Sequence, residues 1–151
     1  MANYAVDFQR TASTTASLFS LTAESTTVAR RMKVYDVIFG SEATPADAAI
    51  LWTVNRCTTE GTGTSVTHAP LDTADSVSTA IALENLSIEP SATSNTTLLN
   101  VALNQRATFR WVAAPGGEIV IPATDENGIM CQTDTISTGT PVITSTVHWA
   151  E

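Results

Sequence analysis

The stretch at residues 107–129, ATFRWVAAPGGEIVIPATDENGI, decides the fold class of this chain. Phe109 and Trp111 share one face of a two-residue period, and this period predicts an extended strand. Residues 115–117, Pro-Gly-Gly, predict a tight turn, because proline fixes φ and glycine accepts a positive φ without steric cost. A second short strand ends at Pro122, after which an Asp-Glu-Asn-Gly run turns the chain again. The stretch therefore predicts part of a compact all-β scaffold.

The amino-acid composition favours sheet over helix along the whole chain. It includes 26 threonines, 13 serines and a single lysine, Lys33. Threonine is β-branched and fits a pleated, half-buried surface, whereas strong helix formers are scarce here. A length of 151 residues suits one domain that buries its own hydrophobic core. We therefore expect residues 1–151 to form a single domain.

Turn signals separate a series of short apolar or alternating segments. This pattern predicts an all-β, two-sheet antiparallel sandwich, jelly-roll-like, with about 8–10 strands and at most one short helix. The helix is expected at residues 72–82, with Asp72 or Thr73 as N-cap, and the alternative there is an irregular crossover loop. A polar turn is expected at residues 24–27. The expected strands are residues 4–9, 17–23, 30–39, 49–58, 83–89, 97–103, 108–113, 118–121, 129–132 and 142–149, and residues 64–68 are a further candidate for a short paired strand.

The charge of the chain limits its partners. A net charge of −8 and a pI near 4.5 make nucleic acid an unsuitable partner, because an acidic surface repels phosphates. Arg30, Arg31 and Lys33 form the one basic cluster of the sequence. Two interpretations stay open for it: a solvated strand end that pairs with carboxylates, or an electrostatic latch for an acidic partner surface. No apolar run approaches the ~18 residues of a membrane span and no signal-peptide pattern is visible, so no membrane partner is expected.

The two cysteines, Cys57 and Cys131, lie far apart and have no CxxC spacing. In a chain made in a reducing cytoplasm we expect them to be buried, reduced side chains that pack as small apolar groups. A disulfide between them is the alternative that the sequence leaves open.

No residue pattern predicts catalysis, a cofactor or a metal site, and we do not expect an enzyme. His68 and His148 are distant in sequence, and neither has a second His or Cys at a ligand spacing. There is no GxSxG motif. A pair of carboxylates could serve glycoside hydrolysis, but solvated surface charges are the favoured interpretation of Glu84, Glu89, Glu118, Asp125 and Glu126. Trp52, Trp111 and Trp149 could stack on sugar rings, although apolar alternation favours the core or a subunit interface.

Two longer segments carry a resemblance to a known family. Residues 34–56, VYDVIFGSEATPADAAILWTVNR, and residues 99–129, LNVALNQRATFRWVAAPGGEIVIPATDENGI, resemble small tailed-phage virion proteins. The family is that of capsid decoration, or cement, proteins of jelly-roll type. The resembling motifs are structural rather than catalytic, so they support a common fold more firmly than a common position in the virion.

The resemblance implies a virion protein, made in the host cytoplasm, that stabilises the phage head by binding the major capsid protein across capsomers. It also implies a symmetric homo-oligomer, commonly a trimer. A possible N-terminal arm, residues 1–16, is expected to extend onto the shell or a neighbouring subunit, so that deleting residues 1–12 would abolish binding but leave the fold intact. The alternative function is a receptor- or carbohydrate-binding sandwich of a phage tail or fibre. The interface candidates are Tyr35, Phe39, Trp111, Trp149, Arg30 and Arg31.

Overall fold

The computed structural model describes residues 1–24 and 28–151, and these residues contain twelve strands and no α-helix. All strand pairs are antiparallel, which confirms the prediction of an all-β, two-sheet antiparallel sandwich. Twelve strands exceed the 8–10 expected, because pairings as short as two residues leave no alternation in the sequence. The expected turn at residues 24–27 lies largely outside the described residues. The strands are β1 (Asn3–Thr11), β2 (Phe19–Thr22), β3 (Met32–Ala43), β4 (Ala49–Cys57), β5 (Thr62–Ser65), β6 (Ala69–Pro70), β7 (Ile81–Ile88), β8 (Ala92–Asn104), β9 (Phe109–Val112), β10 (Ile119–Ile121), β11 (Gly128–Ile136) and β12 (Val142–Ala150).

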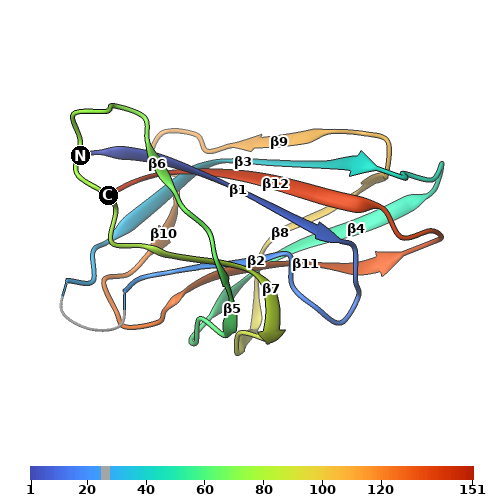
Figure 1. Ribbon diagram of the computed structural model, residues 1–151, viewed down its shortest axis with the longest axis horizontal. Coiled ribbons are helices and arrows are strands. Elements are labelled where there is room, and N and C mark those ends of the chain that lie inside the picture. The colour runs from blue at the N-terminus through green and yellow to red at the C-terminus, as the bar shows by residue number, and fades with distance from the viewer. Residues whose placement is uncertain (25–27) are drawn as a thin grey trace.

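The strand order is that of a jelly roll. One sheet has the order β10-β3-β12-β1-β6, with β9 also paired to β3, and the other has the order β5-β7-β2-β11-β4-β8. Strands β1 to β4 alternate between the two sheets, and so do β11 and β12 (Figure 1). Without β5, β6 and β7, the sheets reduce to β1-β12-β3 with β9 and β10 at the edge, and to β2-β11-β4-β8. This is the pattern of two Greek keys that defines the jelly roll.

Strands β5 to β7 form an insertion between β4 and β8. Strand β7 extends the second sheet beyond β2, while β6 pairs with Tyr4 and Ala5 of β1 in the first sheet. Between β6 and β7 the chain passes around the end of the sandwich where both termini lie (Figure 1). The prediction of a short helix at residues 72–82 is wrong, and the alternative prediction of a crossover loop is confirmed. Asp72 forms a single turn instead, in which its carboxylate accepts a hydrogen bond from the Ala74 N–H at 2.9 Å.

Strand β1 is an inner strand of its sheet. It pairs along its whole length with β12, from Asn3 opposite Ala150 to Thr11 opposite Val142. Tyr4, Val6 and Phe8 are buried on its inner face, as the alternation predicts. The prediction of an N-terminal arm over residues 1–16 is therefore wrong. The polar residues that weaken the pattern of this segment face outward from a strand that the core requires.

The core lies between the two sheets and is built around aromatic contacts. Phe8 and Phe19 stack with ring centroids 4.4 Å apart, and Phe39 contacts Trp52 at 5.0 Å. Each pair joins one sheet to the other, and such contacts contribute about 0.5–1.5 kcal/mol beyond the area they bury. Cys57 and Cys131 are free and buried, which confirms the prediction of reduced thiols in the interior.

Candidate interaction surfaces

The six interface candidates do not share one surface. Phe39 and Trp149 are completely buried inside the chain's own core, so they offer no area to another subunit, and the prediction fails for these two. Apolar alternation shows that a strand face is buried, but it does not show whether the same chain or a neighbour covers it. Trp111 on edge strand β9 is half-buried against the core, and Tyr35 on β3 is half-buried on the outer face of the sheet.

Tyr35 belongs to a charged cluster around Asp36. The Asp36 side chain is only 4% exposed, and Arg110 of β9 donates to both of its oxygens, through Nε at 3.0 and 3.1 Å and Nη2 at 2.6 Å. His148 of β12 lies opposite Asp36 in the ladder, with Nδ1 3.4 Å from Oδ2, and its ring stacks on Tyr35. The hydrogen bonds to Asp36, and then its charge, raise the pKa of Arg110, and burial followed by the same charge raises the pKa of Tyr35. The cluster gives this face a fixed arrangement of charges.

Sequence reasoning missed Asp36, although a signal for it exists. An aspartate lies inside the otherwise apolar run VYDVIF at residues 34–39. A carboxylate at such a position needs a charged or hydrogen-bonding partner, because its burial is otherwise costly. The partner, Arg110, is distant in sequence and reaches Asp36 only because β9 pairs with β3.

Arg30 is part of an internal network at the end of the sandwich that carries the termini. Its Nη1 atom lies 3.4 Å from Oε1 of Glu151, whose side chain is fully buried. The Glu151 carboxylate also accepts hydrogen bonds from the Ser78 hydroxyl, and from the Thr79 N–H at 3.2 Å and hydroxyl at 2.9 Å. Of the two interpretations of the basic cluster, pairing with a carboxylate of the same chain therefore applies to Arg30.

Four exposed apolar residues lie on chain segments that meet at that same end, which we call the terminal end. These residues are Met1, Val28, Leu71 and Val77, with exposed fractions of 86, 48, 57 and 71%. Their segments meet there because the Leu71 N–H donates to the Asn3 carbonyl, the Thr79 hydroxyl lies 3.2 Å from the Val28 carbonyl, and Ala2 and Glu151 exchange backbone hydrogen bonds. Figure 1 shows both termini and the β6–β7 connection at this end. Grouped exposed apolar side chains are typical of an interaction site. No sequence pattern predicted this end as an interaction site. The available signal is a few apolar residues in a segment otherwise rich in Asp, Ser and Thr.

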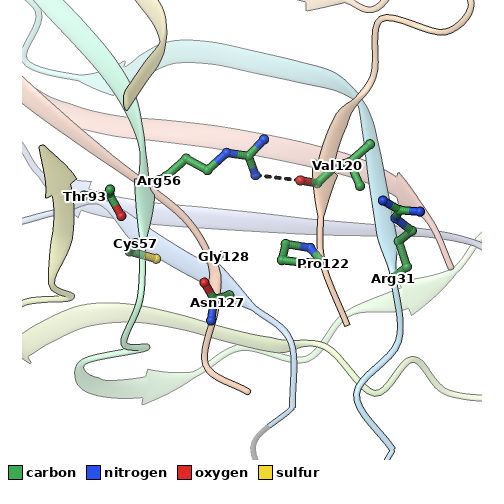
Figure 2. A pocket seen from close by; sticks show the side chains of 8 residues that line it. All are labelled: Arg31, Arg56, Cys57, Thr93, Val120, Pro122, Asn127 and Gly128. Carbon is green, nitrogen blue, oxygen red and sulfur yellow. Dashed lines mark hydrogen bonds between the residues drawn. The ribbon is translucent and has the colours of Figure 1, made fainter. Parts of the chain in front are cut away.

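A hollow of about 320 Å³ opens between the two sheets near β10 (Figure 2). Arg56 of β4 extends toward β10, where its Nη1 donates to the Val120 carbonyl at 2.6 Å. Arg31, the remaining interface candidate, is exposed and also lines the hollow. The lining residues are Arg31, Arg56, Cys57, Thr93, Val120, Pro122, Asn127 and Gly128.

The carboxylates considered for hydrolysis have separate local roles. Glu84 accepts a hydrogen bond from the Gln9 N–H at 3.0 Å, and Glu89 accepts one from the Ser17 N–H at 2.8 Å. Hydrogen bonds from its own N–H and that of Gly116 lower the pKa of the Glu118 carboxyl. Asp125 and Glu126 lie near Glu60, whose pKa is raised first by burial and then by these two charges.

The remaining polar candidates also lie apart. His68 packs against Tyr4 and Trp149, with Nε2 3.0 Å from the Ala80 carbonyl, whereas His148 lies in the Asp36 cluster. Among the described residues there is no group of three His, Cys, Asp or Glu side chains that could hold a metal ion. The described residues also contain no helix long and apolar enough to cross a membrane. Trp52 and Trp149 are buried in the core and have no face for a sugar ring.

Comparisons with known proteins add little to this description. No family model matches the chain, and no curated protein matches it. Among solved structures, a chain from "Structure of infectious bursal disease virus Gt strain" is similar at a TM-score of 0.18 and 10% sequence identity, covering 97% of this chain and 39% of that one. A similarity this low carries no argument about fold or function.

Proposed function

We propose that this chain is a virion structural protein, a decoration or cement protein of a tailed phage that binds the major capsid protein across neighbouring capsomers. One observation carries the proposal: four exposed apolar residues, Met1, Val28, Leu71 and Val77, lie on segments that meet at the terminal end. A surface of this kind gains free energy when a partner covers it. The jelly roll and the resemblance of residues 34–56 and 99–129 to decoration proteins also support it.

The action of such a protein is mechanical. The terminal end docks on the outside of the shell at a joint between capsomers and adds contact area there, and specific interfaces bury about 1,200–2,000 Å². Many copies on one shell act together, so the shell gains stability even when each contact is weak. The rigid sandwich, closed around its own aromatic core, transmits load between the contacts that it makes.

Shell binding is tested by co-sedimentation of the purified protein with expanded, undecorated phage heads. Leu71→Asp combined with Val77→Asp places two charges in the terminal end and is expected to abolish co-sedimentation. Ile88→Asp is the matched control, because Ile88 is 63% exposed but lies at the far end of β7, outside the group. Equal binding by both variants would contradict docking through the terminal end. Absence of wild-type binding to any expanded head would contradict the decoration function itself.

Self-association is tested separately, by light scattering coupled to size exclusion. The proposal expects a symmetric trimer with a mass of three times 15.9 kDa. Tyr35 and Trp111 are the aromatic interface candidates that remain partly exposed for this contact. If the protein is a monomer in solution, the decoration function requires the oligomer to assemble on the shell. If that monomer also binds glycans saturably, a tail or fibre module is favoured instead.

A further inference from the structure

The hollow beside β10 contains a guanidinium group that is mostly free of partners. By strand alternation Arg56 shares a face with Trp52 and Val54, which are buried between the sheets, so its side chain points into the sandwich at its open edge. There Nη1 donates to the Val120 carbonyl of the opposite sheet. A guanidinium has five N–H donors, and no carboxylate of the described part of the chain forms an ion pair with Arg56.

Arg31 adds a second positive charge to the same hollow. It precedes β3 and lies beyond β10 as seen from Arg56 (Figure 2). Within residues 1–24 and 28–151 its side chain has neither a hydrogen bond nor an ion pair. The chain has a net charge of −8, so its surface is acidic overall. Two arginines at one concave site, without a carboxylate partner among the described residues, give that site a local positive potential.

The other lining residues are neutral. Val120 and Pro122 form an apolar wall, and Thr93 and Asn127 add uncharged polar groups. The Cys57 thiol also lines the hollow, and burial raises its pKa to about 12, so it carries no charge at neutral pH. A volume of about 320 Å³ falls at the small end of ligand pockets.

We propose that this hollow is a binding site for a single carboxylate group carried on a short aliphatic stem. The guanidinium fork of Arg56 pairs with the two carboxylate oxygens, Arg31 adds attraction at the rim, and the wall of Val120 and Pro122 covers the methylenes. A carboxylate on an aliphatic stem suits the site better than a phosphate, because one guanidinium fork matches two oxygens and the apolar wall of Val120 and Pro122 matches methylenes rather than further charged oxygens. The site takes either a free organic acid or a glutamate side chain of a partner. It does not depend on the proposed decoration function.

The test is a set of NMR titrations of the full ¹⁵N-labelled chain, followed at the Nε–H signals of its six arginines and at the Gly128 amide. The probes are butyrate, N-acetyl-glutamate N-methylamide, inorganic phosphate, and the uncharged butyramide and N-acetyl-glutamine N-methylamide. We expect saturable shifts of the Arg31, Arg56 and Gly128 signals with the two carboxylates and none with the amides. Saturable shifts with both butyrate and the capped glutamate would assign the site to free organic acids. Saturable shifts with the capped glutamate alone would assign it to a glutamate side chain of a partner.

Two variants connect the shifts to the site. Arg31→Gln, and Arg56→Lys, which keeps the charge but loses the fork, are each expected to weaken carboxylate binding by about tenfold or more. Arg106→Gln is the matched control, because Arg106 is exposed and does not line the hollow. The dispersed amide spectrum of each variant shows that it is folded. Tighter binding of phosphate, equal shifts with butyramide, no saturable shift with either carboxylate, or unchanged affinity in both variants would overturn the proposal.

Discussion

At the scale of single residues, the buried charges of this protein are paired with groups that are distant in sequence. Asp36 is held by Arg110, and Glu151 by Arg30, Ser78 and Thr79. Each carboxylate would be costly to bury alone, and removing one partner of such a pair leaves an uncompensated charge. The sequence showed an acidic residue among apolar ones, but it did not show which of six arginines would neutralise it.

The two thiols give a residue-scale prediction of pH dependence. Burial raises the pKa of Cys57 to about 12 and raises that of Cys131 as well, whereas the thiol of an unfolded chain has a pKa of about 8.5. Below that pH both states are protonated and the thiols leave stability unchanged. Above it only the unfolded state releases protons, so the free energy of unfolding falls as pH rises toward 12, by about 2 kcal/mol per thiol at pH ~10.

Urea denaturation at pH 8 and pH 10 tests this expectation in the wild type and in Cys131→Ala. The variant starts from a lower stability because it leaves a small cavity, but it is expected to lose less stability between the two pH values than the wild type. Tyrosines and the lysine also titrate between these pH values, but their contribution to the change in the free energy of unfolding cancels in the comparison because both proteins contain them. An equal loss in both proteins would show that Cys131 does not titrate differently in the folded and unfolded states.

At the scale of elements, period-two alternation located most strands. The inner faces of β1 and β12 follow the predicted alternation closely, with Tyr4, Val6 and Phe8 against Ile143, Val147 and Trp149 buried. Alternation was less informative where the ladder is irregular. On β3 a bulge opposite His148 and Trp149 changes the phase, so that Val34 and Val37 are both buried on the inner face although they are three residues apart. Such bulges depend on the partner strand and leave no local signal.

Gly128 supports an element-scale prediction. It begins β11 between β2 and β4, and a Cβ atom there would collide with the Leu21 carbonyl and lie 2.6 Å from Cγ2 of Thr22. Gly128→Ala must therefore push β11 away from β2, and it is expected to lower the free energy of unfolding by about 1–3 kcal/mol. The midpoint of urea denaturation measures this loss.

Gly40→Ala is the matched control for that variant. Gly40 lies within β3, has no positive φ, and a Cβ added there would meet its nearest atom, Oγ1 of Thr108, at an ordinary 3.6 Å. Its stability is expected to stay within about 0.5–1 kcal/mol of the wild type, with a gain as the favoured direction. A loss as large in Gly40→Ala as in Gly128→Ala would refute close strand approach as the reason for glycine at position 128.

At the scale of the whole molecule, the fold is closed by strands from the two ends of the chain. Strand β1 pairs with β12, and β12 with β3, so the first sheet exists only when both ends are in place. Deleting residues 1–12 removes one inner strand together with the buried side chains of Tyr4, Val6 and Phe8. We expect this truncation to abolish the cooperative fold, because truncating even one buried aromatic side chain costs about 3–5 kcal/mol and a domain has about 5–15 kcal/mol in total.

The truncation is measured by amide dispersion in NMR spectra and by the cooperativity of thermal unfolding. Deletion of Met1 alone is the control, because Met1 is 86% exposed and precedes β1. It should leave both measurements unchanged. A truncated protein with a dispersed spectrum and a sharp transition would restore the view that residues 1–12 are an arm outside the domain.

By itself, the sequence determined that this protein is an all-β sandwich with most of its strands and inward faces, and that its two thiols are buried. These properties follow from alternation, β-branched content and turn residues, all of which act over a few neighbouring positions. Only the tertiary structure decided that Phe39 and Trp149 are covered by their own chain, that residues 3–11 belong to the core, and that Arg31 and Arg56 share a hollow. It also decided which exposed apolar residues lie on the segments that meet at the terminal end. These features depend on contacts between segments far apart in the chain, and the energy of such contacts is set by the packing of whole sheets rather than by local pattern.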